Sequence, residues 1–157
     1  KWDFRSFDYD RDLAESFRAG SDILDVPADG LRRFFERGGK LLLSHGWADG
    51  LIPAGNTIDF YKSMTEKMDP EEAAGSVRLF MIPGAGHCGG GDAPAVTDML
   101  SVIDRWVETG EAPEGIRAST GPGQKPRSRP LCPYPQTAAY KGSGDLDDAS
   151  SFECRAE

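Results

Sequence analysis

The chain has 157 residues and a formal net charge of −8, and its only basic cluster, residues 125–129, is interrupted by proline. This acidic balance excludes binding to a phosphate backbone as the main function, because such binding draws its affinity from Lys and Arg. No apolar run approaches the roughly 20 residues that a membrane-spanning helix needs. We therefore expect neither a nucleic acid nor a membrane as partner.

Apolar side chains are scarce and unevenly distributed. Leu, Ile, Val and Phe together number 30, and 26 of them lie in residues 1–110. A chain of 157 residues with only 30 of these side chains is close to the lower limit for forming a folded core. We expect residues 1–110 to be globular and residues 111–157 to form an irregular tail that packs on the same domain.

The first elements of the chain are short. Residues 1–12 alternate aromatic and charged side chains without a clear period, which is compatible with a strand edge or a surface plug. Residues 31–37 predict a short helix that Gly38 and Gly39 end. Residues 40–44, an apolar run flanked by glycine, predict a strand buried on both faces.

The pattern then alternates. Residues 55–68 have a single helical face, and Pro70 interrupts that segment. Residues 77–82 predict a second strand, and residues 96–107 give the clearest helical stripe of the chain. This order predicts an α/β fold with parallel strands and crossover helices. Two strands cannot form a complete parallel sheet, so we expect an incomplete sheet whose other strands come from elsewhere.

Two loops follow the predicted strands, at the edge where parallel sheets place their ligands. The first contains His45 and Asp49, and the second contains His87. An Asp that orients a His is part of the Ser-His-Asp arrangement of acyl transfer, and the order Asp then His is that of α/β-hydrolases. We expect Asp49 and His87 to be catalytic. Since the chain has no G-x-S-x-G sequence, the serine would have to precede Lys1.

Other interpretations of these loops stay open. Asp49 could instead cap a turn before Gly50, and His87 could be a hydrogen-bonded loop histidine. A metal site built from His45, Asp49, His87 and Cys88 is a further alternative. Adjacent His and Cys ligands fit no common zinc spacing, however, so we expect no metal site.

Five stretches follow one another between Gly38 and Cys154: GGKLLLSHGWADGLIP, MIPGAGHCGGGDAP, WVETGEAPEGI, RPLCPYPQTAAYKGSGD and a terminal FEC. In this order they resemble the tannase and feruloyl esterase family of α/β-hydrolases. The resemblance implies the carboxy-terminal part of that fold and hydrolysis of aromatic (phenolic) acid esters, terephthalate monoesters included. It makes Asp49 the triad acid and His87 the base. The family's serine, in a Cys-Ser-x-Gly-Gly sequence, would lie upstream.

The resemblance also assigns the three cysteines. It implies that Cys132 pairs with Cys154, which staples the tail, and that Cys88 pairs with a cysteine outside this chain, beside the serine. A free buried thiol is the alternative for Cys88. An odd cysteine count agrees with an external partner, and disulfides indicate a secreted or periplasmic protein.

The remaining expectations concern substrate and partners. The resemblance implies a small aromatic ester as substrate, no cofactor in this chain, and calcium only in a lid domain that lies elsewhere. Trp47 and Ile52 are candidates for the substrate pocket, although Trp47 could equally be a packing residue. The expected partner is the amino-terminal portion of the hydrolase, with the serine and the lid, so the chain alone should be inactive.

A different class of function is the alternative: an inert fragment, or a non-enzymatic binding or interaction module with the same partial fold. Exposed apolar surface beside the two strands would favour a part of a larger enzyme. A sealed sheet edge would favour an independent module.

Overall fold

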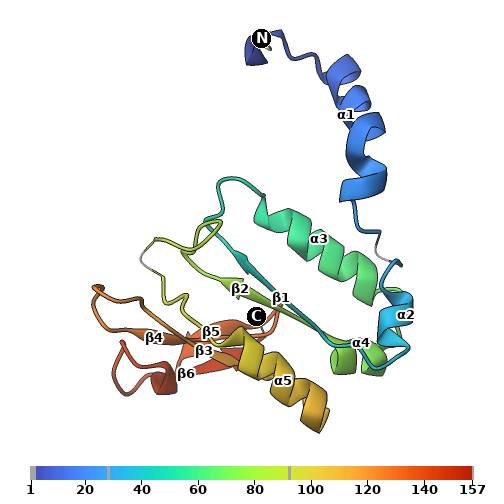
Figure 1. The fold of residues 1–157 in the computed structure, drawn as a ribbon. Coiled ribbons are helices and arrows are strands. Elements are labelled where there is room, and N and C mark those ends of the chain that lie inside the picture. Colours follow the sequence, from blue (N-terminus) through green and yellow to red (C-terminus); the bar gives the residue numbers. More distant parts are fainter. Residues whose placement is uncertain (1–2, 28, 92, 157) are drawn as a thin grey trace.

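The structure is a computed structural model, and it describes residues 3–27, 29–91 and 93–156 (Figure 1). Trp2 lies outside the described residues. The helical elements are η1 (Phe4–Ser6), α1 (Tyr9–Leu24), α2 (Arg32–Phe35), α3 (Ala54–Thr65), α4 (Pro70–Ser76), α5 (Met99–Thr109) and η2 (Ala149–Ser151). The strands are β1 (Leu41–Gly46), β2 (Val77–Ile82), β3 (Ile116–Ser119), β4 (Ser128–Leu131), β5 (Thr137–Tyr140) and β6 (Phe152–Arg155).

Strands β1 and β2 form a parallel pair, in register from Leu41 opposite Val77 to Gly46 opposite Ile82. Two helices lie between them in sequence, where the sequence pattern predicted one helix ended by Pro70. Pro70 instead begins α4, because a proline is tolerated at the first helical position.

Helices cover both faces of this pair. Side chains alternate between the faces of a strand, so Val77 packs with Met64 of α3 and Phe80 packs with Val102 of α5. Figure 1 shows α3 and α5 on opposite sides of β1 and β2. The two strands therefore form a layer between α3 and α5, and the loops lie at the carboxyl ends of the strands.

Residues 111–157 differ from the irregular tail that we expected. They contain β3 and β4, which pair antiparallel, and β5 and β6, which do the same. Ile116, Ala118 and Leu131 are buried against Phe80 of β2, so this segment completes the core on the α5 side. Strands of four residues are too short for an alternating pattern to be recognised in the sequence.

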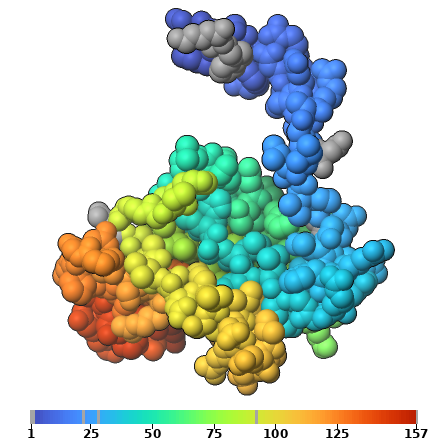
Figure 2. All heavy atoms as spheres, viewed as in Figure 1, coloured from blue at the N-terminus to red at the C-terminus, as the bar shows by residue number. Residues whose placement is uncertain are grey.

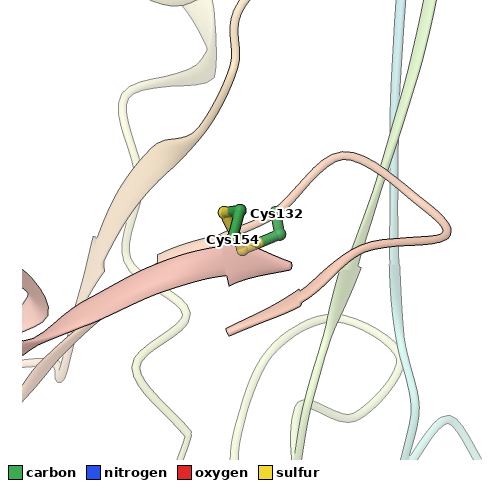
Figure 3. The surroundings of a disulfide bond; sticks show 2 residues. All are labelled: Cys132 and Cys154. Atoms are coloured by element: carbon green, nitrogen blue, oxygen red, sulfur yellow. A yellow bond between two sulfur atoms is a disulfide. The ribbon is translucent and has the colours of Figure 1, made fainter. Parts of the chain in front are cut away.

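A disulfide joins Cys132, directly after β4, to Cys154 in β6 (Figure 3). The two Cα atoms are 5.5 Å apart, and 22 positions separate the residues in sequence. The bond therefore fastens the last strand to the segment that packs on the core.

The amino-terminal segment is helical, which corrects the expectation of a strand edge. Asp8 caps α1 by accepting a hydrogen bond from the backbone N–H of Arg11. The helix projects away from the rest of the chain (Figures 1 and 2), and its Tyr9 and Phe17 side chains are exposed. Within the described ranges, no helix is both long and apolar enough to span a bilayer.

The two edges of the parallel pair differ. On β2, the Leu79 carbonyl accepts a hydrogen bond of 2.8 Å from the Tyr134 N–H, so the tail covers that edge. Among the described residues, β1 pairs with β2 alone. The outer edge of β1 therefore has no strand partner in the part of the chain that the structure describes.

Candidate active site

Two loops meet beyond the ends of β1 and β2. The Trp47 N–H donates to the Ile82 carbonyl, and the Ala48 N–H donates to the Ala85 carbonyl, both at 3.0 Å. We call residues 47–53 the acid loop and residues 83–91 the base loop. Because the strands are parallel and adjacent, the backbone itself brings the two loops together.

The carboxylate of Asp49 uses both of its oxygens. Oδ2 lies 2.8 Å from Nδ1 of His87, while Oδ1 accepts hydrogen bonds from the backbone N–H groups of Leu51 (2.8 Å) and Ile52 (2.9 Å). Only 4% of the side chain is exposed. Asp49 is therefore the turn-capping residue and the histidine partner at once, although the sequence analysis treated these as alternatives.

These contacts also set the charge of Asp49. The backbone hydrogen bond from Ile52 holds the pKa of Asp49 well below its ordinary value of 3.8, and burial opposes this effect. The hydrogen bonds from His87 and Leu51 lower the pKa of Asp49 further. The group facing His87 is consequently a carboxylate at neutral pH.

His87 also lines a cavity. The Asp49 carboxylate is an acceptor, so Nδ1 of His87 carries the hydrogen and Nε2 of a neutral ring is the basic atom. The ring is 42% exposed, and no group in the described part of the chain hydrogen-bonds its Nε2. The cavity measures about 430 Å³, and its lining includes His45, Asp49, His87 and Cys88. An acid–histidine pair at such a cavity can abstract and return a proton.

His45 belongs to the same cluster, a placement that the sequence analysis considered only for a metal. Its Nδ1 lies 2.7 Å from Oγ1 of Thr57 in α3, and its Nε2 lies 3.2 Å from the Ile52 carbonyl oxygen. The same Nε2 is 3.2 Å from Oδ2 of Asp49. Strand alternation was the available signal, because His45 occupies the same face of β1 as Leu43, which packs toward α3.

The other predicted site residues lie around this cluster. Cys88 is exposed and forms no disulfide within the described residues. Trp47 lines a neighbouring cavity of about 110 Å³ with Met81 and Tyr134. Ile52 contributes backbone groups to Asp49 and His45, and its side chain, like that of Trp47, is exposed and outside the lining of the larger cavity.

Within residues 3–27, 29–91 and 93–156, no group of three or more His, Cys, Asp or Glu side chains is arranged to hold a metal ion.

Known proteins are similar to this chain in sequence and in fold. Residues 2–155 match the family model described as tannase and feruloyl esterase. The chain is 46% identical over 130 residues to a mono(2-hydroxyethyl) terephthalate hydrolase of Piscinibacter sakaiensis. This alignment covers 80% of this chain and 21% of the hydrolase. It is 34% identical to a probable feruloyl esterase B-2 of Aspergillus terreus, in an alignment 173 positions long. This alignment covers 98% of this chain and 33% of the esterase.

A solved structure gives the same result for the fold. The crystal structure of feruloyl esterase B from Aspergillus oryzae superposes with a TM-score of 0.83 at 27% identity, covering 99% of this chain and 34% of that one. The chain thus spans between about a fifth and a third of the length of these relatives. Both the sequence and the fold place this chain in the tannase and feruloyl esterase family.

Proposed function

We propose that this chain supplies the acid and the base of a serine esterase that hydrolyses esters of aromatic acids. The observation that carries the proposal is the 2.8 Å contact between Oδ2 of Asp49 and Nδ1 of His87, at the ends of neighbouring parallel strands. The names of the relatives support the substrate class, because one is a terephthalate monoester hydrolase and another a probable feruloyl esterase.

The proposed mechanism assigns one role to each residue. Nε2 of His87 takes the proton of a serine hydroxyl as the serine oxygen attacks the ester carbonyl. Asp49 keeps the ring oriented and stabilises the imidazolium that forms. The same proton then passes to the oxygen of the departing alcohol, and an acyl-serine remains. Water attacks the acyl-serine by the same route, which releases the acid and restores the serine.

We further propose that the serine, the oxyanion donors and the lid belong to a part of the protein outside this chain. The outer edge of β1, which has no strand partner among the described residues, supports this, because unpaired strand groups are a site for pairing with another strand. It also favours a part of a larger enzyme over an independent binding module. In this proposal, residues 1–110 and 111–157 are both carboxy-terminal pieces of one α/β-hydrolase domain, and Cys88 pairs with a cysteine beside the serine.

Two further residues of the acid loop are candidates for contact with the substrate. Trp47 and Ile52 are exposed on the acid loop and would contact the acyl group of the substrate. No cofactor is proposed for this chain, and any calcium would bind in the lid domain. The disulfide supports an oxidising compartment, secreted or periplasmic.

The test compares the complete enzyme with its Asp49→Asn and His87→Ala variants on methyl ferulate, methyl gallate and mono(2-hydroxyethyl) terephthalate. Asp49→Asn should lower kcat by roughly 10⁴-fold, the scale known for a triad acid. The matched control is Asp59→Asn, an exposed residue of α3. Unchanged turnover in Asp49→Asn would remove Asp49 from the mechanism. Ester hydrolysis by the 157-residue chain alone would refute the external serine.

A further inference from the structure

We propose that His45 is a positioning residue, which connects helix α3 to the Asp49–His87 pair and holds the carboxylate in the orientation that His87 requires. The inference rests on the proposed function, since it concerns the same pair. It adds a second histidine behind the acid, with a role distinct from that of the base.

The contacts of His45 determine which of its nitrogens carries the hydrogen. The Ile52 carbonyl oxygen can only accept a hydrogen bond, so Nε2, at 3.2 Å, must be the donor. Nδ1 of the neutral ring is then an acceptor, and the Thr57 hydroxyl at 2.7 Å donates to it. Both ring nitrogens are thus used, and the ring has a single orientation that satisfies them.

The donor nitrogen acts on the acid in two ways. It fixes the Ile52 carbonyl, while the N–H of the same residue donates to Oδ1 of Asp49. It also stands 3.2 Å from Oδ2 of Asp49, the oxygen that accepts from His87. A rotation of the carboxylate would separate Oδ1 from its backbone donors and Oδ2 from both histidines.

The result is one continuous path of contacts from Thr57 through His45, Ile52 and Asp49 to His87. Its first member lies in the first turn of α3, which packs on the sheet, so the path is anchored in the core. The His45 side chain is only 11% exposed, and its contact with Thr57 is partly buried. A ring that merely filled space would need neither a specific donor nor a specific acceptor.

The experiment reads the tautomers of His45 and His87 in the complete enzyme. Long-range ¹H–¹⁵N NMR correlations through the carbon-bound ring protons assign the hydrogen to one nitrogen, and they do not depend on observing the exchangeable proton itself. Spectra are recorded at a pH where the rings are neutral. The titratable groups that line the cavity are His45, Asp49, His87 and Cys88, and the same spectra follow both histidines at once.

Two variants of His45 separate its chemistry from its shape. An Asn side chain places its amide near the position of Nδ1, so His45→Asn keeps a partner for Thr57 and loses the donor toward Ile52. A Gln side chain reaches the position of Nε2, so His45→Gln keeps that donor. Asp49→Asn is the reference for a His87 ring that has lost its carboxylate.

In the wild type we expect His87 to carry its hydrogen on Nδ1 and His45 to carry its hydrogen on Nε2. His45→Asn should shift the ¹⁵N signals of His87 toward those of Asp49→Asn, and His45→Gln should leave them near the wild type. Unchanged His87 signals in His45→Asn, or the same change in both variants, would overturn the proposal.

Thr57 provides a second test that leaves every group of the pair in place. Thr57→Val removes the hydroxyl at similar volume, and Thr57→Ser keeps it. We expect His87 signals to shift in the first variant and not in the second. Equal signals in both would overturn the proposal even if His45→Asn failed to fold.

Kinetics of the complete enzyme distinguish this inference from the proposed function. In an active enzyme, His45→Asn should lower kcat with little change in KM, and His45→Gln should restore kcat. If the wild type hydrolyses no ester while the tautomers shift as described, the proposed function fails and the positioning role stands. If the enzyme is active and His45→Asn keeps the wild-type kcat, the positioning role fails.

Discussion

Gly46 ends β1 directly against the backbone of Ala85, so that a Cβ atom at position 46 would lie 2.2 Å from the Ala85 carbonyl oxygen. That approach is what allows the acid loop to form a backbone hydrogen bond with the base loop, from the Ala48 N–H to the same carbonyl. The distance between Asp49 and His87 therefore depends on a residue with no side chain, three positions before Asp49.

A methyl group at this position should consequently act on stability and on the site together. Gly46→Ala should lower the free energy of unfolding by about 1–3 kcal/mol, as overpacking of a buried position does, and should reduce ester hydrolysis by the complete enzyme. Denaturant unfolding measures the first effect and steady-state kinetics the second.

Gly50 provides the matched control, because a Cβ at this position of the same loop meets no heavy atom within 4 Å. Gly50→Ala should leave both quantities close to those of the wild type. Equal stability of Gly46→Ala and Gly50→Ala would show that the loops do not need their close approach.

The sequence was most informative where one residue pattern determines one element. Residues 77–82 form a strand with the predicted bounds, since a short apolar run between breakers leaves few alternatives. The meeting of Asp49 and His87 followed from the same reasoning, because adjacent parallel strands end at one edge. The double use of the Asp49 carboxylate, however, depends on the path of the backbone from residue 49 to 52, which no spacing rule specifies.

Other features depended on signals that were weak or misread. Asp8 caps α1, but the large apolar side chains of this helix are exposed in the described structure, and their spacing gave no strand-like or core-like pattern. Pro70 was predicted to interrupt a helix. In the structure, Asp69 caps α4 and Pro70 is its first residue. The role of His45 requires the relative placement of α3 and β1, which is a tertiary property.

The charge of Asp49 gives a prediction for stability as a function of pH. The pKa of this group is lowered in the folded chain from its ordinary value of 3.8, so the carboxylate stabilises the fold above about pH 4. That contribution is lost as the pH falls toward the lowered pKa. The difference in unfolding free energy between the wild type and Asp49→Asn should be largest near pH 7 and should narrow below about pH 4.

Denaturant unfolding of both proteins at several pH values between 3 and 7 measures this difference. Acidic groups remote from position 49 titrate equally in both proteins, so the difference reports on Asp49 together with the two histidines that contact it. A gap that stays constant across this range would mean that the carboxylate charge at position 49 has no effect on folding.

The Cys132–Cys154 disulfide should contribute to stability through the unfolded chain. A bond that closes a loop of 22 positions is expected to contribute about 3 kcal/mol. Replacing both residues by serine should lower the unfolding free energy by that amount in the 157-residue chain. Cys88→Ser, which removes an exposed free thiol, is the control and should have little effect. A small loss in the double variant would show that β6 stays in place without its covalent link.

The last prediction concerns whether residues 111–157 are part of the core. Leu131 is 2% exposed and packs with Phe80 of β2, whereas Leu146 in the same segment is 58% exposed. If the segment completes the core, Leu131→Ala should lower the unfolding free energy by about 2–5 kcal/mol, and Leu146→Ala should change it by less than about 0.5 kcal/mol. The two variants remove the same atoms from the same segment, so their difference measures burial alone.

Equal small losses would mean that residues 111–157 lie on the surface of a core that is already complete. A single unfolding transition, with the larger loss confined to Leu131→Ala, would instead show that the parallel pair carrying Asp49 and His87 depends on this segment for its stability.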